Sequence, residues 1–269
     1  MRIASWNINS VRTRVGRAVD LLAKHDIDVL CLQETKVTDE KFPREPFEAA
    51  GYHVTSHGLN QWNGVAIVSK DEPDEVQTFF PGQPGFHKDP AQEQKREARA
   101  VSARIRGIEV WSLYIPNGRE ITDPHYDYKL QFLYALARYV ETRAQSKLLL
   151  TGDFNIAPRD EDVWDMSLFR GKTHVTEPER AAFQMLEEAG LEEVTRRFTE
   201  KERWTYFDYK SLRFQKNEGM RIDFQLATAP LAELVQGAQV DLVERAGDKT
   251  SDHVPLIADF DVPDFDSVR

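Results

Sequence analysis

The chain has 269 residues, of which 41% are hydrophobic and 30% are charged, and this supplies enough apolar material for one large core. The composition excludes a disordered, a collagen-like and a membrane-embedded chain. The formal net charge of −10 excludes a surface that is basic throughout, so a phosphate-binding site would depend on local charges such as Lys95, Arg96 and Arg99.

Short apolar runs predict buried strands along the whole chain. They lie at residues 3–8, 29–33, 64–69, 101–105, 110–115, 147–150, 222–227 and 255–260. The first run reads as a strand and not as a signal peptide. Cys31 falls within the second run, where a buried thiol is expected. A single cysteine forms no disulfide within the chain, so we expect a cytoplasmic protein.

Apolar residues at helical spacing separate some of these strands. They predict helices at residues 17–25, 129–143 and 178–189, the last capped by Thr176 with Pro178 in its first turn. Residues 80–89 are rich in Pro and Gly and predict a surface loop. Because no low-complexity linker divides the chain, we expect a single α/β domain over residues 1–269.

Polar residues follow directly on several predicted strands, where side chains can project from the end of a sheet into a shared cleft. In chain order, the motifs are Trp6-Asn7-Ile8-Asn9, Leu32-Gln33-Glu34-Thr35-Lys36, Tyr114-Ile115-Pro116-Asn117-Gly118, Thr151-Gly152-Asp153-Phe154-Asn155, Arg221-Ile222-Asp223-Phe224 and Ser251-Asp252-His253. Each motif alone is typical of a cap or a turn. Together they predict a site for a hard cation with oxygen ligands and for a phosphate substrate.

These motifs resemble those of the exonuclease III class of abasic-site endonucleases, within the endonuclease/exonuclease/phosphatase superfamily. The resemblance runs from Met1 to about Phe260, and its most specific parts are residues 6–10, 32–36, 152–158, 217, 219–223 and 251–253. It implies a DNase I-like α/β fold, a four-layer α/β sandwich of two packed β-sheets flanked by helices. The apolar pattern by itself supports only a mixed α/β chain.

The resemblance implies a site for Mg²⁺, with Mn²⁺ as an alternative metal. Glu34 is the expected main ligand with Asn7 beside it, and a carboxylate suits Mg²⁺, which prefers oxygen ligands. The wider set of expected metal ligands comprises Asn7, Glu34, Asp153, Asn155, Asp252 and His253. The alternative for Glu34 is a salt bridge to Lys36 or another basic residue. Asn9 stands where some relatives have an Asp, which leaves a neutral or water-mediated contact near the metal.

The resemblance also implies catalytic roles for Tyr114, Asp153, Asn155, Asp223 and His253. Asp153 would activate water or assist the leaving oxygen, and Asn155 would orient the phosphate or the water. Residues two apart on an extended chain share a face, which would bring these two side chains together. Asp223 would favour the imidazolium form of His253, which can stabilise charge on the phosphate; the alternative is a structural Asp–His hydrogen bond. Tyr114 would contact the phosphate, although a strand tyrosine is usually a core residue.

Asn117, Tyr206 and Lys210 are the expected substrate-binding residues. Tyr206 and Lys210 belong to an aromatic stretch, residues 204–210, which the family uses to hold the exposed sugar and enter the DNA; a tightly packed loop is an equal alternative. Tyr206 stands where the bacterial prototype has Trp, Lys210 where Arg is usual, and Met220 where many members have Trp. These departures leave open the balance between cutting at abasic sites and trimming 3′ ends.

The sequence therefore predicts a Mg²⁺-dependent DNA repair nuclease, a hydrolase that cuts double-stranded DNA 5′ to abasic sites and trims 3′ ends in the 3′-to-5′ direction. We expect a monomer with no membrane partner. Two other functions stay open: a phosphatase or phosphodiesterase acting on lipids or nucleotides, and a catalytically inactive DNA-binding homologue. The intact set of Glu34, Asp153, Asn155, Asp223 and His253 argues against the second.

Overall fold

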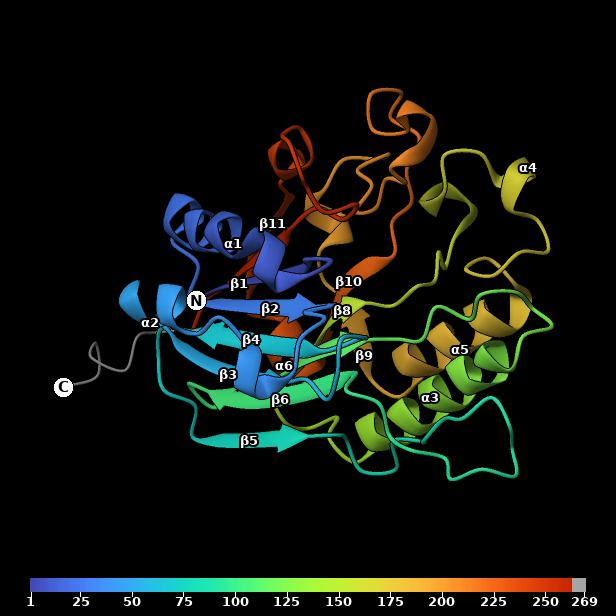
Figure 1. Ribbon diagram of the computed structural model, residues 1–269, viewed down its shortest axis with the longest axis horizontal. Coiled ribbons are helices and arrows are strands. Elements are labelled where there is room, and N and C mark those ends of the chain that lie inside the picture. The colour runs from blue at the N-terminus through green and yellow to red at the C-terminus, as the bar shows by residue number, and fades with distance from the viewer. Residues whose placement is uncertain (263–269) are drawn as a thin grey trace.

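The computed structural model describes residues 1–262, which form two stacked six-stranded sheets between helices (Figure 1). Sheet A comprises, in spatial order, β11 (Val235–Val240), β12 (Leu256–Phe260), β1 (Arg2–Asn7), β2 (Val29–Gln33), β4 (Val65–Ser69) and β3 (His53–His57). Sheet B comprises β5 (Glu75–Thr78), β6 (Ala100–Ile105), β7 (Ile108–Tyr114), β8 (Leu148–Asp153), β10 (Asp223–Thr228) and β9 (Leu191–Glu193). Residues 263–269 of the predicted domain lie outside the described residues.

Helices cover the outer face of each sheet, so the predicted four-layer sandwich is confirmed. α1 (Val11–His25) and α2 (Glu45–Ala49) lie on sheet A, and α3 (Pro124–Glu141) and α5 (Glu177–Glu188) lie on sheet B. Two further short helices are α4 (Met166–Phe169) and α6 (Ala229–Ala232). Five 3-10 turns complete the described elements: η1 (Asp39–Lys41), η2 (Asp160–Asp162), η3 (Arg196–Phe198), η4 (Lys210–Leu212) and η5 (Leu242–Arg245). Within residues 1–262, no helix combines the length and hydropathy needed to cross a membrane.

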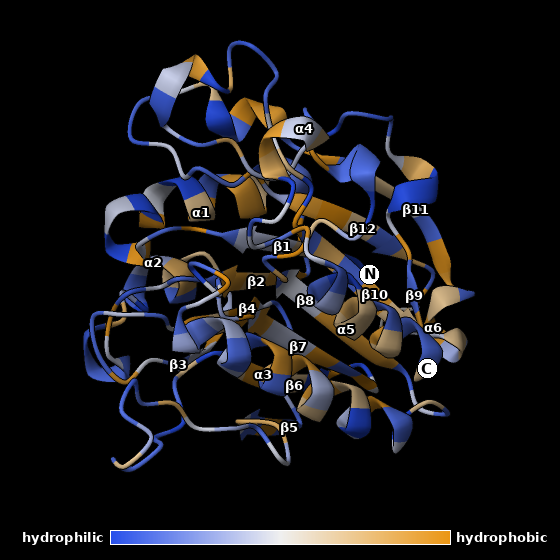
Figure 2. Cartoon of the chain, turned by 90° about the vertical axis from the view of Figure 1, so that its right-hand side faces the viewer, coloured by the Kyte–Doolittle hydropathy of each residue, from blue (hydrophilic) through white to orange (hydrophobic). Residues whose placement is uncertain are grey.

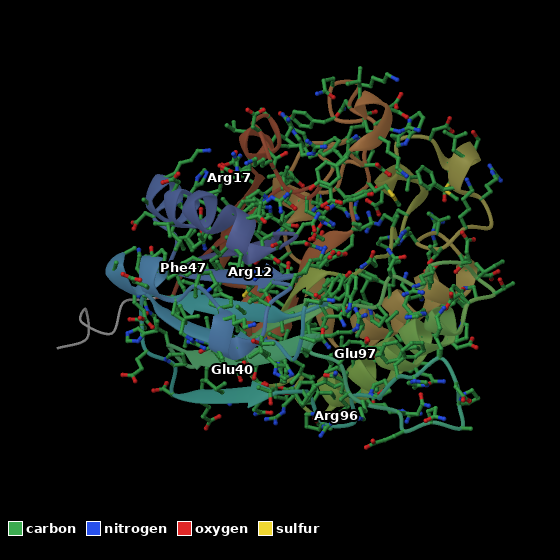
Figure 3. All side chains as sticks on the ribbon, viewed as in Figure 1. Arg12, Arg17, Glu40, Phe47, Arg96 and Glu97 are labelled. Atoms are coloured by element: carbon green, nitrogen blue, oxygen red, sulfur yellow. The ribbon has the colours of Figure 1, made fainter. Side chains whose placement is uncertain are left out.

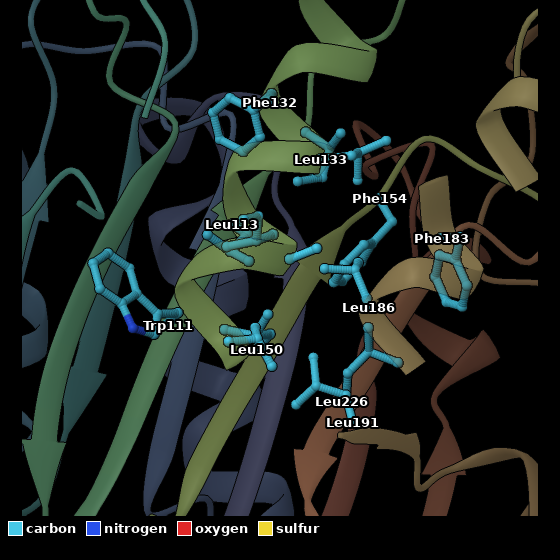
Figure 4. Packing of buried hydrophobic residues seen from close by; sticks show 14 of the residues in the cluster. Trp111, Leu113, Phe132, Leu133, Leu150, Phe154, Phe183, Leu186, Leu191 and Leu226 are labelled. Atoms are coloured by element: carbon cyan, nitrogen blue, oxygen red, sulfur yellow. The ribbon is translucent and has the colours of Figure 1, made fainter. Parts of the chain in front are cut away.

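Strand alternation divides the apolar side chains into three main core layers. Between the sheets, Ile3, Val29 and Ile67 of sheet A pack with Val110 and Leu149 of sheet B. The outer face of sheet A packs against α1 and α2. On the outer face of sheet B, strand residues pack against α3 and α5, as Figure 4 shows for Trp111, Leu113, Leu150, Leu226, Phe132, Leu133, Phe183 and Leu186. Hydrophobic residues accordingly concentrate on the strands and inner helix faces (Figure 2).

Two parallel strand pairs bring the motif-bearing strand ends to one edge of the sandwich. β1 pairs in parallel with β2, with Asn7 beside Gln33, and β7 pairs in parallel with β8, with Tyr114 beside Asp153. The order β1-β2-β4-β3 of sheet A recurs in sheet B as β7-β8-β10-β9. Parallel neighbours end at the same edge of a sheet, so the residues after β1, β2, β7 and β8 meet there.

All eight predicted strands are present, with ends that differ by at most a few residues. Four further strands, β3, β5, β9 and β11, are missing from the prediction. Cys31 is fully buried between the sheets as predicted, and burial raises the pKa of its thiol. Residues 80–89 lie outside strands and helices, as expected for a loop.

The predicted helix starts were wrong in two of three cases. α1 begins six residues earlier than predicted, because Val11 and Arg14 are buried although the segment is polar overall. α3 begins at Pro124, since the carboxylate of Asp123 accepts from the backbone N–H of His125 and caps the helix. The predicted Thr176 cap of α5 is confirmed: its hydroxyl accepts from the N–H of Glu179.

Gly152 is a glycine that the fold requires. Its φ is +148°, and a Cβ at this position would lie 1.9 Å from the carbonyl oxygen of Leu113 on the neighbouring β7. We expect Gly152→Ala to lower the free energy of unfolding by at least about 2 kcal/mol in urea denaturation.

Gly16 is the matched control, because it lies in α1 and a Cβ added there would meet nothing within 4 Å. Gly16→Ala should raise the free energy of unfolding by about 0.5–1 kcal/mol. Equal effects of the two substitutions would contradict the contact assigned to Gly152.

Candidate active site

The candidate site lies at the end of the space between the sheets. At the site end of β1, β8 and β10, the outermost inward-facing residue is polar and lies four positions from an inter-sheet core residue: Asn7 from Ile3, Asp153 from Leu149, and Asp223, the first residue of β10, from Ala227. Residues four apart on a strand share a face, so alternation alone directs these three side chains into the same space. All three are at most 1% exposed.

Glu34 joins this group through a break in the alternation after β2. Its φ is +51°, a left-handed conformation that turns the chain at the strand end. Its Oε1 accepts from Asn7 Nδ2 at 2.8 Å, and the same amide donates to Asp153 Oδ2 at 3.0 Å. The alternative salt bridge is also present, with Lys36 Nζ at 2.8 Å from Glu34 Oε2. Although burial alone would raise the pKa of Glu34, Lys36 and Asn7 lower it.

Asp223 and His253 form the predicted carboxylate–imidazole pair. His253 Nδ1 lies 2.8 Å from Asp223 Oδ2, and His253 Nε2 lies 3.7 Å from Asp153 Oδ2. Burial alone would lower the pKa of His253, but Asp223 and Asp153 raise it to about 10. Burial raises the pKa of Asp153 to about 7, against the effect of His253. The site therefore holds an imidazolium between the carboxyl groups of Asp223 and Asp153.

Asn155 reaches the site by a different route from the one predicted. The strand ends at Asp153, and Asn155 has a φ of +52°, so the extended chain assumed for the Asp153–Asn155 alternation was wrong. A turn replaces it, in which Asp153 Oδ1 accepts from the Asn155 N–H at 2.9 Å. The Asn155 side chain donates to Ile115 O at 3.1 Å and accepts from Asn117 Nδ2 at 2.9 Å, which joins Asn117 to the site.

Tyr114 ends β7 beside Glu34. Burial and the Glu34 carboxylate raise the pKa of its phenol well above the ordinary value, so the hydroxyl keeps its proton. The Arg99 guanidinium lies 4.8 Å from the ring centroid of Tyr114 and is ion-paired with Glu97 at 2.6 Å. Arg99 is buried, so of the three basic residues named from the sequence Lys95 and Arg96 are the exposed ones. Figure 3 labels Arg96 and Glu97 in this region.

The aromatic stretch is tightly packed in part and exposed in part, and its contact with DNA stays a prediction. Trp204 and Phe207 are buried, whereas Tyr206 is half-buried and Tyr209 is 51% exposed. The ring centroid of Tyr206 lies 5.0 Å from that of His253. The Lys210 side chain is exposed on η4, and the site contacts within residues 1–262 do not include it.

A cavity of about 390 Å³ opens beside Tyr206. Its lining includes Tyr206, Met220, Trp164 and His174. Tyr206 and Met220, two of the three departures from the family pattern, therefore both line this cavity.

Asp252 lies next to His253 and faces Asn9. Its Oδ1 accepts from Asn9 Nδ2 at 3.1 Å, and Lys36 Nζ donates to Asn9 Oδ1 at 2.5 Å. The neutral Asn9 thus links Asp252 to the Lys36–Glu34 pair. A metal-binding role of Asp252 stays a prediction.

His174 belongs to the site although the sequence pattern did not single it out. Its Nδ1 is hydrogen-bonded to the carbonyl oxygen of Asn155, and the ring lines the cavity beside Tyr206. Burial lowers the pKa of His174 to about 4, so the ring is neutral at neutral pH. A carbonyl accepts, so Nδ1 carries the proton and Nε2 is the acceptor. A lone histidine in a predicted loop gave no periodic signal that could have identified it.

The residues present fit a divalent metal ion. Asp153, Asp223 and His253 offer ligand atoms within 4.8 Å of one another, and Asn7 joins the Glu34 carboxylate to Asp153 of this group. Asp223 Oδ1 is buried and lacks a hydrogen-bond partner in the described part of the chain. Three carboxylates in one desolvated space repel one another, and a hard cation with oxygen ligands relieves that repulsion.

The sequence and the fold agree on the class of protein. The model of the Endonuclease/Exonuclease/phosphatase family matches residues 4–253, a span that contains every motif of the site. The chain therefore belongs to the endonuclease/exonuclease/phosphatase family.

Within this family, similar proteins place the chain in the exonuclease III class, which the sequence motifs also indicate. Exodeoxyribonuclease III of Haemophilus influenzae is 34% identical over 97% of this chain and 100% of its own length. Two solved structures are each 36% identical with a TM-score of 0.89 over 97% of this chain. One is an AP endonuclease from Archaeoglobus fulgidus, covered to 100%; the other, covered to 99%, is the 3′ phosphatase NExo from Neisseria bound to a product DNA hairpin. The predicted membership of the exonuclease III class is confirmed, and so is the prediction that the protein is a hydrolase.

The pKa of His253 gives a test of the site geometry. Asp223→Asn should lower this pKa, because the Asp223 carboxylate is the largest of the groups that raise it. NMR titration of the His253 ring in metal-free protein measures the shift. In the wild type, protonated His253 stabilises the fold below its unfolded pKa of about 6.5, and this contribution is lost as pH rises through about 10. An unchanged pKa in Asp223→Asn would contradict the pairing.

Proposed function

We propose that this chain is a Mg²⁺-dependent DNA repair phosphodiesterase that cuts 5′ to abasic sites and trims 3′ ends. The observation that carries the proposal is the convergence of Glu34, Asn7, Asp153, Asp223 and His253 at one end of the inter-sheet space. The named relatives support it, since they include an exodeoxyribonuclease III, an AP endonuclease and a 3′ phosphatase bound to DNA. A cytoplasmic location and a monomeric state stay predictions from the sequence.

Asp153 is the proposed acceptor of a proton from the attacking water. A group with a pKa near 7 is poised for proton transfer at neutral pH, and Asn7 fixes the orientation of its carboxylate. A Mg²⁺ ion, or Mn²⁺ in its place, held by Glu34 with Asn7 would supply Lewis-acid polarisation of a phosphate oxygen. Asp153, Asn155 and Asp252 are the other candidate ligands, and their geometry also suits direct contact with phosphate or water. His253 would bind the metal only after losing the proton that makes it an imidazolium.

Charge that develops on the phosphate needs preorganised donors. The imidazolium of His253, with its Nε2 directed toward Asp153, supplies a cationic N–H at the reacting position. Tyr114 keeps its phenolic proton and offers an O–H from the end of β7 in sheet B. Asn155, held by Asn117 and the Ile115 carbonyl, presents an amide whose position is fixed before substrate arrives. These donors support hydrolysis of a phosphodiester.

The surroundings of the site favour DNA over a small phosphoester. The 390 Å³ cavity lined by Tyr206 and Met220 gives a displaced sugar or a 3′-terminal group a place beside the reacting residues. Tyr209 and Leu212, 51% and 63% exposed, provide apolar surface next to this stretch of chain. Exposed aromatic and aliphatic side chains near a phosphate site are typical of contact with bases. A small soluble headgroup would leave this surface without a partner.

Removal of the proton acceptor provides the first test of the mechanism. Asp153→Asn should lower the rate of cleavage of a labelled duplex with one abasic site by at least about 10²-fold, because the amide cannot accept the proton. Binding of the uncleaved duplex, measured by fluorescence anisotropy, should persist. Near-normal turnover of this variant would show that the role of Asp153 is wrong.

Metal removal provides the second test and separates the rival functions. EDTA should abolish cleavage of the abasic duplex, Mg²⁺ should restore it, and Glu34→Gln should raise the Mg²⁺ concentration that half-maximal activity requires, since it removes a charged ligand. Inositol phosphates serve as the comparison substrate. Hydrolysis of inositol phosphates with no DNA cleavage would support the phosphatase alternative, and DNA binding with no cleavage at any metal concentration would support the inactive homologue.

A further inference from the structure

A buried ion pair lies directly beneath the candidate site, and none of the roles above uses it. Lys129 of α3 and Glu179 of α5 are ion-paired, and both side chains are 0% exposed. An ion pair in the protein interior loses the hydration of both charges, so its net contribution to stability is small or negative compared with apolar residues of similar volume. Stability alone therefore gives no reason for charges at these two positions.

The ammonium of Lys129 is directed at the loops that carry site residues. Besides Glu179, its Nζ donates to the backbone carbonyl oxygen of Asn155 at 2.6 Å and of Asn117 at 3.3 Å. An ammonium has three N–H donors, and here each has an acceptor. One cation thus fixes the backbone of both residues whose side chains are hydrogen-bonded to each other at 2.9 Å.

Asn155 needs such a restraint because its backbone is strained. Its φ of +52° is uncommon for a residue other than glycine. Such a conformation persists only where surrounding contacts determine it. The contact from Lys129 to the Asn155 carbonyl, together with the Asp153 contact to its N–H, holds this residue from both sides.

Glu179 extends the network to a third segment. Its carboxylate accepts from Thr173 Oγ1 at 2.8 Å, from the His174 N–H at 2.9 Å and from Thr176 Oγ1 at 2.6 Å. The same segment carries the His174 ring, which is bonded to the Asn155 carbonyl. The ion pair therefore connects three loops that line the site: residues 115–118, 153–157 and 173–176.

We propose that Lys129 and Glu179 are positioning residues: their buried ion pair holds Asn155, Asn117 and His174 in the arrangement that phosphodiester hydrolysis requires. The proposal rests on the proposed function for its kinetic readout, but not for its structural one. Neither residue faces the reacting groups, so the pair acts through the loop backbones. Its loss should then affect turnover more than substrate binding.

The double variant Lys129→Met/Glu179→Gln tests this directly. It removes both charges at similar volume, so no buried charge is left unpaired, and the amide oxygen that replaces the Glu179 carboxylate remains an acceptor for Thr176 at the start of α5. We expect kcat for the abasic duplex to fall roughly 10- to 100-fold with KM changed less than about threefold, because small misplacements of positioned groups cost this much. Hydrogen–deuterium exchange of residues 153–157 should become faster.

Glu109→Gln is the matched control. Glu109 is a buried carboxylate near the start of β7, at the other end of the strand from Tyr114, and it accepts from Trp111 Nε1 at 2.8 Å and from Tyr139. Its loss should affect stability, whereas kcat per folded molecule and exchange of residues 153–157 should remain at the wild-type level. An equal loss of kcat in the control would assign the effect to general destabilisation and overturn the proposal.

The possible results separate this inference from the proposed function. If the wild type cleaves the duplex and the double variant has a wild-type kcat with unchanged exchange at residues 153–157, the positioning role is wrong. If the wild type fails to cleave, the proposed function is wrong, and the exchange measurement alone decides whether the ion pair holds the loops. Should this double variant not fold, Lys129→Leu/Glu179→Gln, which likewise leaves no buried charge unpaired and keeps an acceptor for Thr176, carries the same comparison.

Discussion

The side-chain amide of Asn7 is the contact on which the geometry of the site depends, because it joins the two sheets where their strands end. Its two N–H donors reach Glu34, which follows β2 of sheet A, and Asp153, which ends β8 of sheet B. Two further contacts hold the end of β1: Ser251 Oγ donates to Asn7 O at 2.6 Å, and Trp6 Nε1 donates to His253 O at 3.0 Å. The end of β1 thus holds Glu34 and Asp153, one acidic residue from each sheet, and the segment that carries His253.

This arrangement follows from the stacking of two similarly connected sheets. Each sheet has a central parallel pair followed by two antiparallel strands, β1-β2-β4-β3 in one and β7-β8-β10-β9 in the other. Each half therefore supplies polar side chains at the equivalent edge, Asn7 and Glu34 from one and Tyr114 and Asp153 from the other. Packing of the inter-sheet core fixes the distance between the two sets, so the site depends on core volume as well as on its own hydrogen bonds.

The sequence predicts the central strands well because they are buried on both faces and read as continuous apolar runs. The strands it misses lie at or near the sheet edges. β5 has one half-buried residue among exposed ones, and β3 has a single buried residue, so neither shows an apolar run. β9 has three residues, which is shorter than any pattern that identifies a strand. The start of α1 was missed for a related reason, since one of its buried residues is the charged Arg14.

The periodicity of the sequence predicts some residues of the site but not others. Asn7, Asp153 and Asp223 follow from strand alternation, whereas Glu34 and Asn155 depend on left-handed backbone conformations that no periodicity encodes. Lys129 lies within a segment predicted as a helix, but a lysine is almost never fully buried, so its position gives no sign of an interior role. The motif Thr176-x-x-Glu179 predicts a helix cap, yet only the fold shows that the same carboxylate also receives an ammonium.

The burial of Cys31 has a practical consequence for labelling chemistry. The thiolate is the reactive form of cysteine, and this thiol, enclosed between the sheets with a raised pKa, is protected from alkylating reagents while the sheets remain stacked. A second cysteine introduced on the surface would therefore accept a fluorophore alone, with no need to replace the native residue first. Conversely, the rate at which Cys31 is alkylated in the unaltered chain would report how often the two sheets separate.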